Sequence, residues 1–248
     1  MNCDCYFCDG LFQLNKKLGL ASEESIIYQD DNVFITPDIA PVVEGHFLIV
    51  ARVHWNSFAN ADENTYTSLE KAKDFLRNSV LKDTKILFFE HGAVRKNTAG
   101  ACIEHAHMHV IPISFYPKKI LQRIIYFLIH TFKILIFKRF FGTPRYITDI
   151  VIDSFINMFT SSQKIEANKY NFLKCAKDNQ SYIFYEIEKN NAWLYHVEML
   201  PHQFFRMMVS YHFSINHYRW GEQYETDKSK ELFQNTLKLG RRGLRKKN

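Results

Sequence analysis

The chain has 248 residues, of which 46% are hydrophobic and 15% aromatic, so it can bury one large core or one domain with an extension. Its formal net charge of +6 favours anionic ligands such as phosphates, but it is too small to predict binding to a specific nucleic acid. The number of cysteines is odd, three of the five cluster near the N-terminus, and the first residues contain no apolar signal segment. These features argue against a disulfide framework and predict a cytoplasmic protein.

The first half of the chain alternates short apolar runs with turn-forming residues, which predicts a strand meander with one main helix. Strands are expected at residues 25–29, 32–36, 46–53 and 85–89, and in a histidine-rich segment that ends near residue 112. A short helix is expected over 10–18, and the main helix from Asp62 or Asn64 to about Val80, where apolar residues recur at helical spacing. The residues between 91 and 103 are predicted to form a loop. This order of elements predicts an α+β fold.

Residues 118–141 are strongly apolar but contain six basic side chains. Their uninterrupted apolar run is shorter than the roughly 20 residues needed to span a bilayer. One interpretation is a helix packed on the core or on a second subunit. The other is a basic amphipathic helix that lies on the inner face of an anionic membrane.

The second half of the chain is predicted to add helices and one hairpin. A helix is expected over 147–160, a polar break over 161–169, a hairpin from strands 181–187 and 192–199, and a helix after Pro201. The units expected from this pattern are a domain at 1–115, a basic helical insertion at 116–169, a hairpin and helix packed on the core at 170–236, and a disordered basic tail at 237–248.

The histidine-rich segment Glu104–Ile111 carries the strongest chemical signal. His105, His107 and His109 alternate with small or apolar residues, so in a strand all three imidazoles point the same way. Three imidazoles on one face can bind a metal ion, transfer protons or attack phosphorus. The intervening residues predicted to face the core are Ala106, Met108 and Val110.

This segment closely resembles the motif of the histidine triad family. The upstream residues Thr36-Pro37-Asp38, the Gly45-His46 pair and His54 resemble the first half of the family, in which a Gly-His pair opens a buried strand and a second histidine ends it. The resemblance covers roughly residues 3–113. It implies a catalytic domain with an antiparallel sheet and one main helix, followed here by a helical and hairpin extension.

The resemblance also implies roles for individual residues. In the family the middle histidine of the motif attacks phosphorus and forms a nucleotidyl-histidine intermediate, and that role carries onto His107. His109 would hydrogen-bond the phosphate or the leaving group, and His46 would complete the cluster from the neighbouring strand. Asp38 stands where family members contact ribose hydroxyls. The alternatives are a buried structural histidine at position 46 and a turn-forming aspartate at position 38.

Two further segments are predicted to bind the substrate. The loop Asn97–Cys102 contains small residues that let backbone N–H groups approach a phosphate, so Asn97, Gly100 and Cys102 are candidates. Packing is the alternative role for Cys102. The segment after Pro201 resembles part of some larger family members. Gln203 and Arg206 could therefore face the site, with Arg206 balancing phosphate charge, or could lie on a plain surface helix.

The spacing of Cys5 and Cys8 is typical of metal ligands, and a tetrahedral site needs two more. His54 and His105 are the candidates. This set resembles the zinc site of the galactose-1-phosphate uridylyltransferase branch of the superfamily, which implies a structural zinc ion. Cys3 is a spare thiol, and unliganded reduced thiols are the alternative.

The resemblance implies an enzyme that cleaves a nucleoside-phosphoryl bond in a nucleotide or nucleotide conjugate. One alternative is a nucleotidyltransferase or phosphorylase in which a second phosphate replaces water as the acceptor. Another is a non-catalytic nucleotide-binding scaffold that contacts a membrane through residues 118–141. Small family members are often dimers, so a homodimer is a further expectation.

Overall fold

The computed structural model describes residues 5–8, 24–93, 98–113, 149–157, 159–189, 191–213, 215, 219–223 and 225–245. The predicted helix at 10–18, the basic segment 118–141 and residues Cys3 and Asn97 lie outside the described residues. Within the described part of the chain, no helix combines the length and the apolar character that crossing a membrane requires.

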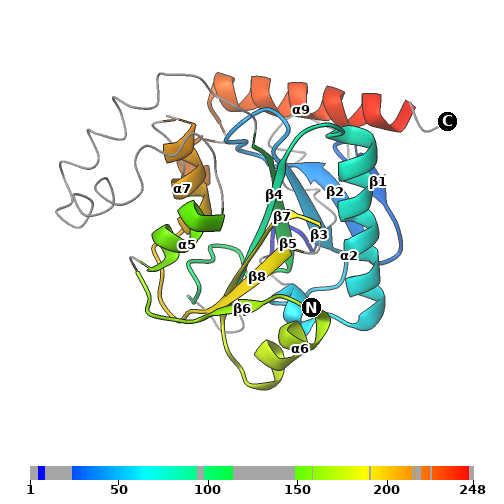
Figure 1. The fold of residues 1–248 in the computed structure, drawn as a ribbon. Coiled ribbons are helices and arrows are strands. Elements are labelled where there is room, and N and C mark those ends of the chain that lie inside the picture. Colours follow the sequence, from blue (N-terminus) through cyan, green and yellow to red (C-terminus); the bar gives the residue numbers. More distant parts are fainter. Residues whose placement is uncertain are drawn as a thin grey trace.

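All described strands form one sheet in the order β1-β2-β3-β5-β4-β7-β8-β6, and neighbouring strands are antiparallel (Figure 1). In chain order they are β1 (Tyr28–Gln29), β2 (Val33–Pro37), β3 (Phe47–Ala51), β4 (Ile86–Gly92), β5 (His107–Pro112), β6 (Lys164–Glu166), β7 (Tyr182–Glu188) and β8 (Asn191–His196). The predicted α+β fold with an antiparallel sheet is therefore confirmed. The predicted hairpin is β7 and β8, and it continues the sheet because β7 pairs with β4.

Two strand predictions need correction. β4 continues past Phe89 to Gly92, so His91 belongs to a strand and not to the predicted loop. The polar segment 161–169 contains β6, whose backbone pairs with β8 despite its polar side chains. In both cases backbone pairing with a neighbouring strand decides the structure, and the side-chain pattern does not show it.

One face of the sheet is covered by α2 (Glu63–Phe75) and α6 (Lys169–Lys177), as Figure 1 shows for α2. The side chain of Asp62 accepts a hydrogen bond from the backbone N–H of Thr65 and caps α2, as the sequence predicts. A π-helical turn, Leu76–Val80, continues α2 to the predicted end. Alternate residues of β5, including Met108 and Val110, are fully buried in the core on this face.

The other face is covered in part by α5 (Asp149–Asn157) and α7 (Phe204–His212), which pack over β4, β7 and β8 (Figure 1). The short helix α8 (Trp220–Gln223) follows. Beside α7, over β2, β3 and β5, this face holds the pocket described below.

The predicted disordered tail at 237–248 is wrong for residues up to 245. These residues belong to α9 (Asp227–Arg245), which lies across one end of the molecule against β2 and the turn after α2 (Figure 1). Phe233, Leu237 and Gly240 are buried at helical spacing, and Gly240 lies against Ile27. The basic residues Lys238, Arg241, Arg242 and Arg245 are exposed and occupy the solvent face of this amphipathic helix.

Candidate active site and metal cluster

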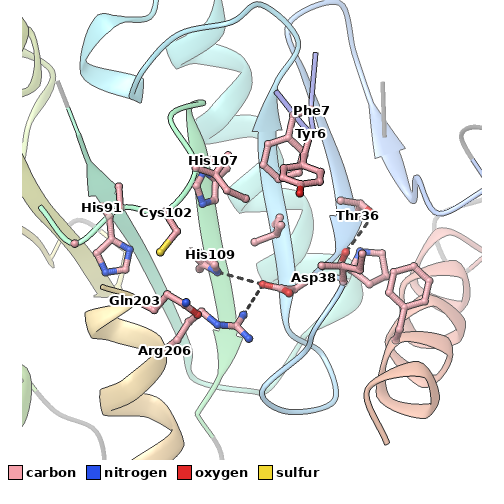
Figure 2. Close-up of a pocket in the computed structure, with 17 residues that line it drawn as sticks. Tyr6, Phe7, Thr36, Asp38, His91, Cys102, His107, His109, Gln203 and Arg206 are labelled. Carbon is pink, nitrogen blue, oxygen red and sulfur yellow. Dashed lines mark hydrogen bonds and ion pairs between the residues drawn. The ribbon is translucent and has the colours of Figure 1, made fainter. Parts of the chain in front are cut away.

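The histidine-rich segment delivers two histidines to a pocket and one to a separate cluster. His107 and His109 are the first and third residues of β5, and both line the pocket in Figure 2. The side chain of Met108, between them, is buried in the core on the opposite face of the sheet. His105 lies just before the strand, and its Nδ1 faces the thiols of a separate cluster.

His107 is held with one ring nitrogen toward the protein and the other available to the pocket. Its Nδ1 lies 2.6 Å from the backbone oxygen of His105. Because a carbonyl oxygen can only accept, Nδ1 carries the proton and Nε2 keeps its lone pair. Burial lowers the pKa of His107, although the His105 carbonyl and Asp38 act in the opposite direction. The ring is therefore neutral at pH 7.

His46 and His109 form a directed chain of hydrogen bonds. The backbone N–H of Val42 donates to Nδ1 of His46 at 3.1 Å, which leaves the proton of His46 on Nε2. That nitrogen lies 3.0 Å from Nδ1 of His109, so His109 accepts there and carries its own proton on Nε2. Burial lowers the pKa of His46 to about 4 and that of His109 well below its ordinary value. Both rings are neutral in this state.

Asp38 and Arg206 are a buried ion pair beside these rings. Nη1 of Arg206 donates to Oδ2 of Asp38 at 2.8 Å, and Nη2 donates to the backbone oxygen of Ala40 at 2.6 Å. Oδ1 of Asp38 accepts from the N–H of Ala40, and Oδ2 lies 3.4 Å from Nε2 of His46. Burial opposes the ionisation of Asp38, yet Arg206 and then His46 lower its pKa. Arg206 is 2% exposed and is thus not on a plain surface helix.

His91 is a pocket residue that the sequence predictions missed. Its Nε2 accepts the backbone N–H of Phe205 at 3.3 Å, which places its proton on Nδ1. The ring lines the pocket edge-on to His109, with 6.4 Å between centroids. Burial, followed by His107 and Arg206, lowers the pKa of His91 to about 3. Extending the strand of residues 85–89 by two would have placed His91 on the same face as Phe89.

The loop before β5 is fixed to the segment that leads into α7. Gly100 has φ +70°, and a Cβ there would lie 2.5 Å from the backbone oxygen of Pro201, so the turn requires glycine. The backbone N–H of Gln203 donates to the oxygen of Gly100 at 2.9 Å. Gly100, Cys102 and Gln203 all line the pocket, and burial raises the pKa of the Cys102 thiol.

The pocket therefore has a polar side and an apolar side. The polar side carries the histidines, Gln203 and the Asp38–Arg206 pair. The apolar side is formed by Tyr6, Phe7, Ile39, Leu48, Ile103 and Phe233. α9 contributes Phe233, and its Thr236 accepts a hydrogen bond from the N–H of Gly45, next to His46. An apolar wall opposite convergent polar groups suits a ligand with a flat ring and a charged end.

The four predicted metal ligands lie together. Sγ of Cys5 is 3.2 Å from Nδ1 of His105, and Sγ of Cys8 is 3.0 Å from Nδ1 of His54 and 3.8 Å from Nδ1 of His105. All four donor atoms lie within 4.8 Å of one another. The predicted ligand set is thus brought together by a turn near the N-terminus, the chain after β3 and the chain before β5.

The orientation of His105 suits a metal ligand. Its Nε2 lies 2.7 Å from the backbone oxygen of Ala51, so that nitrogen carries the proton and Nδ1 turns its lone pair toward the thiols. Two thiols and two imidazoles make a tetrahedral donor set of the kind zinc prefers. The residues present therefore fit a zinc ion.

Sequence comparison identifies the family of the chain. The HIT domain profile matches residues 20–115. An uncharacterized HIT-like protein of Borreliella burgdorferi is 30% identical over 111 residues, which are 44% of this chain and 75% of the relative. The chain belongs to the histidine triad (HIT) family. The adenylylsulfatase HINT3 of Arabidopsis thaliana is 26% identical over 113 residues, which are 44% of this chain but only 52% of that relative.

Solved structures give weaker similarities. A zinc-bound histidine triad family protein from Mycobacterium smegmatis is 25% identical, with a TM-score of 0.31 over 44% of this chain and 74% of that one. Yeast Ap4A phosphorylase Apa2, in complex with Ap4A, is 13% identical, with a TM-score of 0.36 over 78% of this chain and 67% of that one. TM-scores at this level indicate only partial likeness.

Proposed function

We propose that this protein is a nucleotide phosphohydrolase that works through a covalent nucleotidyl-histidine intermediate on His107. The observation that carries the proposal is the fixed tautomer of His107, a neutral imidazole whose Nε2 lone pair is left for the pocket. A neutral imidazole is a competent nucleophile toward phosphorus. The HIT family membership and the naming of HINT3 as an adenylylsulfatase support nucleotide substrates.

In the first step, Nε2 of His107 attacks the α-phosphorus, an N–P bond forms and the bond to the leaving group breaks. The leaving group takes the electron pair of that bond. His109 carries its proton on Nε2, so it can donate to a phosphate oxygen or to the departing atom. The carbonyl of His105 stabilises the positive charge that develops on the ring of His107.

In the second step, water attacks the phosphorus, a P–O bond forms, the N–P bond breaks and His107 recovers its lone pair. The proton that the water loses returns to Nε2 of His109, which gave its own proton to the leaving group. The released nucleoside monophosphate retains the added oxygen. Asp38 and Arg206 support both steps by holding the two rings in place, because Oδ2 of Asp38 lies 3.4 Å from Nε2 of His46 and 3.6 Å from Nδ1 of His109. The nucleobase would lie against the apolar side of the pocket.

His91 supplies a neutral donor to the same substrate. Its Nε2 is engaged by the backbone of Phe205, so only Nδ1–H is left for the pocket. A donor at this position can hydrogen-bond a phosphoryl or leaving-group oxygen without adding charge. Gly100, Cys102 and Gln203 line the same polar side and are proposed to contact the substrate there.

The four-residue cluster is proposed to hold a structural zinc ion. The donor set and the tautomer of His105 support it. Cys5, Cys8, His54 and His105 would fill a tetrahedral coordination shell, so a bound zinc ion would supply a cross-link between these segments.

The test is turnover of an adenosine 5′-phosphoramidate and of a dinucleoside polyphosphate by wild type and by His107→Gln. We expect wild type to release a nucleoside monophosphate, and His107→Gln to lose activity by at least about a thousandfold, as a missing nucleophile does. An α-labelled substrate should label acid-quenched wild type and not the variant. His196→Ala, on β8 outside the pocket, is the matched control. Equal activity in His107→Gln would contradict the proposal.

Repeating the assay with inorganic phosphate separates hydrolysis from transfer. With the phosphoramidate, hydrolysis gives the monophosphate and ammonia and no other nucleotide, at any phosphate concentration. A nucleoside diphosphate that increases with added phosphate would instead identify a phosphorylase.

A further inference from the structure

Two aromatic residues lie between the two thiols of the metal cluster, and both belong to the substrate pocket. Tyr6 and Phe7 occupy the turn closed by Cys5 and Cys8, whose backbone N–H and oxygen are hydrogen-bonded at 3.3 Å. Both side chains line the pocket, as Figure 2 shows. The segment that supplies half of the metal ligands therefore also supplies part of the apolar side of the pocket.

Phe7 connects the two clusters directly. Its ring is 3% exposed and lies 5.5 Å from the ring of His105 and 5.6 Å from the ring of His107, measured between centroids. It packs in one hydrophobic cluster with Phe34 and Leu48, and Leu48 also lines the pocket. One aromatic ring thus touches a metal ligand on one side and the candidate nucleophile on the other.

A metal ion would hold this turn in place far more firmly than the thiols alone. Without the ion, Cys5 and Cys8 offer only weak hydrogen bonds to the imidazoles. With it, the turn is cross-linked to His54 after β3 and to His105 before β5. Such a cross-link removes conformational freedom from a short segment and makes its position depend on the metal.

We propose that the metal ion acts as a clamp that holds Tyr6 and Phe7 against the substrate pocket, so that nucleotide affinity depends on metal occupancy. This proposal rests on the nucleotide site proposed above. It gives the ion a task in substrate binding even though the ion does not touch the substrate.

The backbone of His105 suggests a second effect of the clamp. The same residue offers Nδ1 to the metal and accepts the Nδ1–H of His107 on its carbonyl oxygen. Holding the ring of His105 therefore also steadies the acceptor that fixes the tautomer of the nucleophile. Metal loss should weaken nucleotide binding because Phe7 is no longer held in the pocket. It should also slow turnover because the carbonyl of His105 no longer holds the ring of His107.

The experiment measures the dissociation constant of AMP by calorimetry for zinc-loaded and chelator-treated protein, with metal content determined and secondary structure monitored by circular dichroism. Removal of zinc should weaken AMP binding by about tenfold or more, which corresponds to about 1.4 kcal/mol and is within the contribution of one aromatic contact. Cys175→Ala removes a buried thiol from α6, outside the cluster, and should leave both affinities unchanged.

A double-mutant cycle identifies the route of the coupling. In zinc-loaded Phe7→Ala, AMP binding should already be weakened, and removing zinc should then add less than about a threefold effect. Equal effects of zinc removal in wild type and Phe7→Ala would overturn the clamp, because independent contributions are additive. Unchanged AMP affinity in metal-free wild type would also overturn it.

Reciprocity provides a measurement that does not require the metal-free protein to fold. If zinc raises AMP affinity by a given factor, AMP must raise zinc affinity by the same factor. Competition for zinc between the protein and a chelator, with and without saturating AMP, measures this change in zinc affinity. No effect of AMP on zinc affinity would overturn the clamp. The proposed hydrolase is judged separately, since it fails when His107→Gln keeps its activity, whatever the metal does.

Discussion

His105 and His107 are separated by one residue, yet they serve two different clusters because their protons lie on different nitrogens. His105 donates from Nε2 to the backbone oxygen of Ala51 and turns Nδ1 toward the thiols. His107 donates from Nδ1 to the backbone oxygen of His105 and keeps Nε2 for the pocket. In each case a backbone carbonyl selects the free nitrogen, and the free nitrogen decides the chemistry.

The two clusters also differ in how their lone pairs are arranged. In the metal cluster, four donor atoms converge on one point, which is the arrangement a cation requires. In the pocket, donors and acceptors alternate from Val42 through His46 to His109. That chain ends in an N–H that can donate to a substrate. Converging lone pairs favour a metal ion, whereas an alternating chain favours a neutral network poised for proton transfer.

Breaking the Asp38–Arg206 pair should disrupt the pocket and leave the metal cluster intact. Arg206→Met leaves a buried carboxylate without its cation, which costs about 3–5 kcal/mol when one partner of such a pair is removed. Urea unfolding at pH 7.5 measures the loss, and metal analysis of the folded variant should still find stoichiometric zinc.

The matched control is Asp38→Asn combined with Arg206→Met, which removes both charges. It should recover a substantial part of the free energy of unfolding, because no unpaired charge remains buried. If Arg206→Met alone is as stable as wild type, the pair does not support the pocket as described. Loss of zinc from the folded single variant would show that the two clusters are not separable in this way.

Substitutions at His91 distinguish a substrate donor from a structural residue. Asn at position 91 retains a donor near the place of Nδ1, whereas Gln retains an acceptor near the place of Nε2, which Phe205 uses. His91→Asn should keep most of kcat/KM, and His91→Gln should lose about ten- to a hundredfold, the value of one hydrogen bond to a charged group.

The opposite order, with His91→Gln active and His91→Asn impaired, would show that His91 only positions the backbone of α7. Metal content should be the same in both variants, because the described contacts of His91 lie on the pocket side.

The sequence predicts the first half of the fold well because its signals are local. Alternation along the histidine-rich segment correctly places Ala106, Met108 and Val110 in the core, and the cysteine spacing with His54 and His105 correctly predicts a cluster. These depend on periodicity and on ligand chemistry, which a single sequence displays. The roles assigned to His46, His107 and His109 stay predictions.

The remaining features depend on contacts between distant segments. The pairing of β4 with β7 carries the strand on to His91, and the sequence pattern ending at Phe89 does not reveal it. The position of Arg206 depends on Asp38, 168 residues away. The sequence of α9 resembles a charged tail because most of its residues are polar. Its buried face becomes visible only when Phe233, Leu237 and Gly240 are recognised as recurring at helical spacing.

Glu90, on β4 beside His91, holds the chain near the metal cluster and makes the stability of the protein depend on pH. It is 1% exposed, its Oε1 accepts the N–H of Phe58 and its Oε2 accepts the hydroxyl of Tyr182. It thereby fixes the 3-10 turn Phe58–Asn60, which follows the candidate metal ligand His54. Burial raises its pKa from 4.5 to about 7, although both hydrogen bonds oppose the shift.

Because the folded state binds this proton more tightly, the stabilisation from Glu90 is fully present below about pH 4.5 and is lost as the pH rises through 7. Glu90→Gln lacks that contribution. Between pH 7.5 and 5.5 the free energy of unfolding of wild type should therefore gain about 2 kcal/mol relative to Glu90→Gln. Urea unfolding of both proteins at the two pH values measures the difference, and the subtraction cancels the titration of the buried histidines. A difference that stays constant with pH would mean that Glu90 is already ionised in the folded protein at pH 5.5, and that its hydrogen bonds to Phe58 and Tyr182 outweigh its burial.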